Sequence, residues 1–121
     1  MASVPSFQPH ASDDEVLLEA VLNTASHLGL PKKELAEIVH LDERTLRRKS
    51  GLDPNSAAGQ LALLLVRAYR SAFVLMGGAE GARYWFHTPN LALNGSPREL
   101  VASIEGLVRV VGYLDAMRGK V

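Results

Sequence analysis

Residues 84–100 read YWFHTPNLALNGSPREL, and this stretch decides how the carboxy-terminal half of the chain folds. Three adjacent aromatic residues end one helical pattern, and the Thr88-Pro89-Asn90 turn follows them at once. Residues 94–97 combine Asn-Gly with Ser-Pro, which is a second turn signal. Two turns this close to three aromatic side chains predict a compact helical corner and not a flexible tail.

The apolar residues of this stretch are expected to face the protein core. We expect Trp85 to be a core anchor, because large aromatic side chains usually fill cores. Between the two turns, Leu91 and Leu93 are expected to pack inward. The corner would then be held by aromatic and aliphatic packing.

A helix start follows the second turn. Ser96 fits the cap position, Pro97 the first helical position and Glu99 the third, where a carboxylate reaches back to the cap amide. The helical pattern continues from Val101 to Met117 with more apolar residues than one buried face requires. This excess is typical of a protein interface, although a plain core helix is the simpler explanation for its inner residues.

The amino-terminal end is predicted to be an arm followed by a helix. Residues 1–11 contain two prolines and show no periodicity, so we expect a loose arm. A helix then begins at Ser12, because Ser12 and Glu15 fit a capping box, and it ends at Gly29.

Residues 31–51 have the pattern of a helix-turn-helix, with two short helices and Asp42 as the cap of the second. Residues 44–49 include four basic residues and no acidic one, and such a patch can neutralise phosphates. The alternative is an ordinary solvated helix face, because acidic residues nearby weaken the local field. The candidate DNA-binding residues are Arg44, Thr45, Arg47, Arg48 and Lys49.

The longest helical pattern begins at Asn55 or Ser56 and continues to about Met76. It is apolar on nearly every side, so it is either buried or covered by a partner. We expect it to join the two halves of the protein as a central pillar. The glycine cluster at residues 77–81 ends it, and without a preceding strand or a Lys-Ser/Thr pair this cluster is a turn, not a phosphate loop.

Composition excludes several classes of function. The 121 residues include 13 basic and 13 acidic ones, so no net charge attracts nucleic acid to the whole molecule. There is no cysteine for a disulfide, a thiolate nucleophile or a cysteine zinc site. No histidine pair has metal-ligand spacing and no serine has nucleophile spacing. We therefore predict no enzyme activity, no metal and no cofactor.

Targeting signals are also missing from the sequence. The first ten residues lack the basic and apolar regions of a signal peptide. The most apolar run, Leu61–Val66, is far shorter than the roughly 20 residues of a membrane span. We expect a soluble cytoplasmic protein that does not associate with membranes.

In their order and spacing these motifs resemble the carboxy-terminal toxin-binding domain of Xre/MbcA/ParS-type antitoxins. The family also has a helix-turn-helix ahead of this domain, so the resemblance extends over most of the chain. It departs at residues 57–60, where Ala-Ala-Gly-Gln stands in place of acidic residues and an arginine. The residues that carry the resemblance are Trp85, Pro89, Asn90, Leu93, Gly95, Pro97, Leu100, Gly106, Leu114 and Gly119.

The resemblance implies an all-α fold with three parts. These are a flexible arm (1–11), an Xre-like helix-turn-helix module (12–54) and a carboxy-terminal helical toxin-binding domain (55–121), which a long central helix joins to the module. It implies the antitoxin of a type II pair, which binds and inhibits a cognate RES-domain toxin that degrades NAD. The expected assembly is a hetero-oligomer with the toxin, with a homodimer as a further form. Operator DNA is the second expected partner, through which the protein would repress its own operon.

The candidate toxin-binding residues lie at the end of the chain. They are Arg109, Tyr113, Met117, Arg118, Gly119, Lys120 and Val121. In this hypothesis the terminal carboxylate mimics the diphosphate of NAD, while Arg118 and Lys120 pair with acidic residues at the rim of the toxin pocket. A frayed terminus without a role is the alternative.

Two other functions would use the same fold. A helix-turn-helix transcription regulator without a toxin partner would lose all function when Arg47 and Arg48 are replaced by alanine. An antitoxin would still neutralise its toxin after that change. An architectural or polar-targeting adaptor would neither inhibit an enzyme nor bind an operator.

Overall fold

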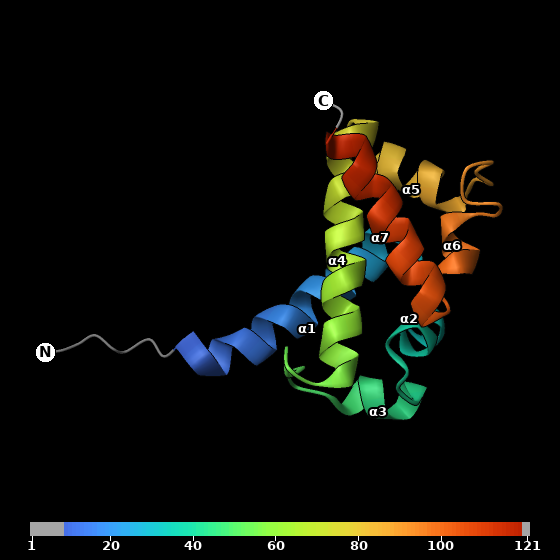
Figure 1. Ribbon diagram of the computed structural model, residues 1–121. Coiled ribbons are helices and arrows are strands. Elements are labelled where there is room, and N and C mark those ends of the chain that lie inside the picture. The colour runs from blue at the N-terminus through green and yellow to red at the C-terminus, as the bar shows by residue number, and fades with distance from the viewer. Residues whose placement is uncertain (1–8, 120–121) are drawn as a thin grey trace, which may run out of the picture.

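The computed structural model describes residues 9–119, and every regular element in that range is a helix (Figure 1). The predicted all-α fold is confirmed. In chain order the helices are α1 Pro9–Leu28, α2 Lys32–Val39, α3 Glu43–Arg48, α4 Ala57–Met76, α5 Ala79–His87, α6 Pro97–Leu100 and α7 Ile104–Gly119.

The central helix α4 packs against four other helices. α7 runs beside it in the same direction, and α1, α2 and α5 cover other parts of its surface (Figure 1). By length and composition alone α4 could cross a membrane, but core helices of soluble proteins pass the same test. Here Ala62 and Leu65, at its middle, are fully enclosed by protein. The predicted pillar is therefore a core helix shared by both halves of the described chain.

Local signals set the ends of α4 as predicted. Ser56 is the cap, because its Oγ accepts the amide hydrogen of Gly59 at 3.0 Å. Gly77 ends the helix in the left-handed region, with φ of 82°, which costs glycine little.

The helix-turn-helix forms from α2 and α3. Leu35 and Leu46 are buried between these helices and the rest of the core. Asp42 caps α3, because its carboxylate accepts the amide hydrogens of Arg44 and Thr45 at 3.1 and 3.3 Å. The turn also places His40 in the left-handed region, with φ of 60°.

The corner at residues 88–97 forms as predicted. The capping box is complete: Ser96 Oγ accepts from the Glu99 amide, and Glu99 Oε1 accepts from the Ser96 amide, each at 3.2 Å. Before it, Asn90 and Gly95 pair as an isolated antiparallel bridge. The two turns thereby fold residues 90–95 back on themselves.

The predicted start of the last helix at Val101 was wrong. The helix that opens at Pro97 ends at Leu100, and α7 begins at Ile104. Ser103 is the reason, because its Oγ accepts the amide hydrogen of Gly106 at 3.0 Å and so caps a new helix.

The predicted start of the first helix at Ser12 was also wrong. α1 begins at Pro9, because a proline is compatible with the first turn of a helix, where its missing amide hydrogen is not needed. Residues 9–11 of the predicted arm therefore belong to α1. Residues 1–8 of that arm lie outside the described part of the chain.

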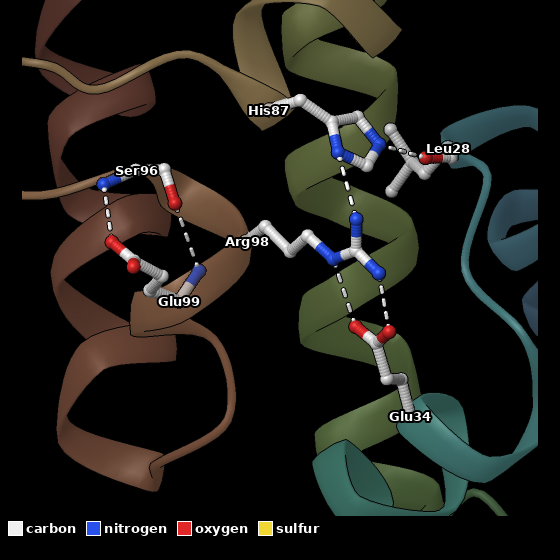
Figure 2. A network of polar contacts seen from close by, with 6 residues as sticks. All are labelled: Leu28, Glu34, His87, Ser96, Arg98 and Glu99. Carbon is white, nitrogen blue, oxygen red and sulfur yellow. Dashed lines mark hydrogen bonds and ion pairs between the residues drawn. The ribbon is translucent and has the colours of Figure 1, made fainter.

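A polar cluster ties the helix-turn-helix to the carboxy-terminal half (Figure 2). Arg98 on α6 donates two hydrogen bonds to the carboxylate of Glu34 on α2, one of them from Nε to Oε1 at 2.9 Å. Arg98 Nη1 also lies 3.1 Å from His87 Nδ1, and His87 Nε2 lies 2.7 Å from the Leu28 carbonyl oxygen. Because a guanidinium only donates, His87 accepts at Nδ1 and donates from Nε2.

This cluster has an electrostatic consequence for Glu34. The hydrogen bonds from Arg98, together with its positive charge, hold the pKa of Glu34 below its ordinary value, against the opposing effect of burial. The same pair raises the pKa of Arg98. The ion pair therefore contributes to stability only while Glu34 is ionised.

Two glycines of α7 should respond in opposite ways to alanine. A Cβ at Gly106 would lie 1.9 Å from the Leu100 carbonyl oxygen, so we expect G106A to lower the free energy of unfolding by about 1–3 kcal/mol. A Cβ at Gly112 would meet nothing within 4 Å, so G112A should raise it by roughly 0.5–1 kcal/mol. Urea unfolding of both variants measures this, and a G106A variant as stable as wild type would contradict the packing described.

Replacing Glu34 by glutamine should destabilise the protein in a pH-dependent way. Because the pKa of Glu34 is lowered in the folded state, its stabilising effect is complete above the unfolded pKa, about 4.3. The effect is lost as the pH falls through the folded pKa. Wild type and E34Q should therefore differ in free energy of unfolding at pH 6 and converge at low pH.

A matched control for this experiment is E37Q. Glu37 is an exposed residue of the same helix and forms no ion pair among residues 9–119. Its replacement should change stability by less than about 0.5 kcal/mol. A difference between wild type and E34Q that does not depend on pH would show that the ion pair is not the cause.

Candidate functional site

The basic residues predicted to contact DNA lie together on and beside α3. Arg44, Thr45, Arg48 and Lys49 are exposed, as expected. Arg47 is instead paired with Glu43 one turn earlier, at 2.7 Å, which reduces its availability for phosphate. α3 lies at the lower end of the molecule in Figure 1, away from α5 and the 90–95 turn.

The residues predicted to contact a toxin fall into two groups, of which Arg109 and Tyr113 form the first. Arg109 donates from Nη2 to the Leu93 carbonyl oxygen at 2.9 Å, which braces the 90–95 turn. Tyr113 stacks on Trp85, with ring centroids 6.3 Å apart and planes within 9°. Both side chains therefore support the surface formed by α5 and the turn that follows it.

The last of these predicted residues lie elsewhere. Arg118 donates to the Ser71 hydroxyl at 3.2 Å and so attaches the end of α7 to α4. Met117 is half-buried and Gly119 is exposed. Lys120 and Val121 lie outside the described residues.

The structure adds a surface that the sequence did not indicate. A groove of about 310 Å³ opens between the end of α4, α5 and the turn after α5. No charged side chain lines it. The lining residues are Met76, Gly81, Tyr84, Trp85, Thr88, Pro89 and Asn90.

One expectation about this corner was wrong. Leu91 does not pack inward but is fully exposed, at 102%, because the fold of the turn points it away from the buried Leu93. Trp85 packs against the core from a partly buried position at the edge of the groove, and the more deeply buried aromatic residue of α5 is Phe86, which is 4% exposed. α5 is nine residues long, and it packs with Phe86 and Ala82 facing the core.

Across residues 9–119, no group of three or more histidine, aspartate or glutamate side chains could hold a metal ion. The arrangement is instead suited to contacts with another macromolecule, through an exposed basic helix and an apolar groove.

Comparison with known families identifies both halves of the chain. The model of the family "Antitoxin Xre/MbcA/ParS C-terminal toxin-binding domain" matches residues 71–120. The model of the family "Antitoxin Xre-like helix-turn-helix domain" matches residues 10–67. The two matches together extend over most of the sequence, and no curated protein sequence matches it.

A solved structure agrees with these matches. One chain in the crystal structure of the M. tuberculosis MbcT–MbcA toxin–antitoxin complex is similar, with a TM-score of 0.60 and 28% sequence identity. The match covers 88% of this chain and 96% of that chain. As predicted, the matched families are antitoxins and not enzymes. The chain therefore belongs to the Xre/MbcA/ParS family and is the antitoxin of a toxin–antitoxin system.

Proposed function

We propose that this antitoxin binds and inhibits a RES-domain toxin that degrades NAD. The observation that carries the proposal is the match of residues 71–120 to a toxin-binding domain, and the RES class comes from the family resemblance of the sequence. Inhibition follows from direct occupancy of the toxin surface and is stoichiometric.

The contact surface lies in the carboxy-terminal part of the chain. We place it in the predicted toxin-binding domain, residues 55–121, with the helix-turn-helix module at residues 12–54. α4 packs against helices of both parts. The boundary at residue 54 therefore divides the sequence and does not correspond to a gap in the core. The complex is a hetero-oligomer of toxin and antitoxin.

A second role is repression of the protein's own operon. The support is local: Arg44, Arg48 and Lys49 are exposed on and beside α3, and none of them forms an ion pair among residues 9–119. Such groups can neutralise phosphates even though the whole chain has no net charge. One copy has a small footprint, so a homodimer or a larger complex would read a palindromic operator. We place both activities in the cytoplasm.

Inhibition should be measurable with the RES-domain protein encoded beside this antitoxin's gene. The loss of NAD catalysed by that toxin should fall linearly with added antitoxin and stop at a fixed molar ratio. Unchanged NAD loss at excess antitoxin would refute the proposal. A chain shortened by Lys120 and Val121 tests the tail in the same assay, and full inhibition by it would remove the tail from the contact surface.

DNA binding should depend on the exposed arginines of α3. Replacing Arg44 and Arg48 by alanine should weaken operator binding and reduce the slope of its salt dependence by about 2, one for each phosphate contact. The same variant should inhibit the toxin as wild type does. The matched control is R83A, an exposed arginine of α5, which should leave the salt slope unchanged. An unchanged slope for the α3 variant would contradict this role.

A further inference from the structure

Leu91 is displayed to solvent on a turn that cannot easily move. The Asn90 side chain accepts the amide hydrogens of Ala92 and Leu93 at 2.8 and 3.3 Å. The Asn90 backbone is bonded to Gly95 in both directions, with N to O distances of 2.9 and 3.3 Å. The turn is thus fixed internally, and its one fully exposed large apolar side chain is held at a set position.

The turn is also fixed from outside. Leu93 is buried at 3% exposure, and its carbonyl oxygen accepts a hydrogen bond from Arg109 on α7. A turn whose backbone is already ordered before binding loses little backbone conformational entropy when a partner covers it. Leu91 therefore has the properties of a binding anchor and not those of a side chain on a mobile loop.

The uncharged groove lies next to this turn, because it includes Pro89 and Asn90. Tyr84, on one side of it, is 74% exposed, and Trp85 is supported from behind by Tyr113. Gly81 lets the start of α5 lie close against the end of α4 at one edge of the groove, since a Cβ there would lie 2.1 Å from the Met76 carbonyl oxygen. The exposed apolar side chain of Leu91 thus follows directly after two residues that line an uncharged groove.

Other exposed apolar residues of this half do not form a comparable surface. Phe73 and Val74 on α4, and Ile104 and Val108 on α7, are each about half exposed or somewhat more. None of the four lines the groove. Within residues 71–119, the part of the toxin-binding match that is described, the exposed Tyr84 lines the groove, and Leu91 follows directly after its lining residue Asn90.

We propose that Leu91 and the groove beside it form the apolar centre of the toxin-binding surface. This inference rests on the proposed function. Leu91 enters an apolar recess of the toxin, and an uncharged apolar side chain of the toxin enters the groove against Tyr84 and Trp85. The toxin is the occupant because Leu91 and the groove both fall inside the segment matched to a toxin-binding domain, and because a groove without charged lining favours an apolar partner group.

Single substitutions test the proposal in binding to the RES-domain protein encoded beside this gene. L91A and Y84A should each weaken binding by about 30-fold or more, as expected for anchor residues at an interface centre. V74A and V108A remove comparable exposed apolar side chains of the same half and should change the dissociation constant by less than about 3-fold. Leu91 is fully exposed, so L91A should unfold at the same urea concentration as wild type.

The outcomes separate this inference from the function on which it rests. If the toxin binds wild type, L91A and Y84A with the same dissociation constant, the inference is wrong and the antitoxin function stays intact. Failure of wild type to bind the toxin would instead refute the proposed function. If the purified antitoxin alone self-associates through Leu91, and the substitutions alter only that association, a second copy is the occupant and the inference is wrong.

Discussion

α4 carries a wide apolar stripe that has to be covered, and the packing of the other helices follows from this requirement, while Leu63, Phe73 and Val74 on its outer side stay about half exposed. The helices before it in the chain and those after it each supply part of the cover. The helix-turn-helix and the carboxy-terminal helices therefore share one core. The ion pair between Glu34 and Arg98 adds a polar connection between the two halves, with α2 and α6 as its two ends.

The sequence predicted most helix ends because their signals are local. Asp42, Ser56 and Ser96 cap helices through bonds to amides only two or three residues away, which a short pattern reveals. The break before α7 was missed although Ser103 offers the same kind of cap, because the apolar periodicity continues across it. The Glu34–Arg98 pair joins residues 64 apart in the sequence, and no spacing rule reports such a contact.

The candidate surface was predicted less well than the fold. Periodicity located Arg109 and Tyr113 on an outer stripe of α7 but gave no information on what covers that stripe, and in the structure these residues support the turn and α5. Whether a leucine between two turns faces in or out depends on the direction of the turn. Leu91 and Leu93, two residues apart, have opposite environments for this reason. A groove depends on several elements at once, and only tertiary structure reveals it.

In the proposed division of roles, the toxin contacts α5 and the 88–95 turn, which α7 supports through Arg109 and Tyr113, and DNA contacts α3. Hydrogen exchange of the backbone amides, measured with and without the cognate RES-domain toxin, tests this division most directly. The account predicts slower exchange in residues 79–95 of the complex, and unchanged exchange in residues 43–48. Protection confined to residues 32–48, with none in the carboxy-terminal helices, would contradict it.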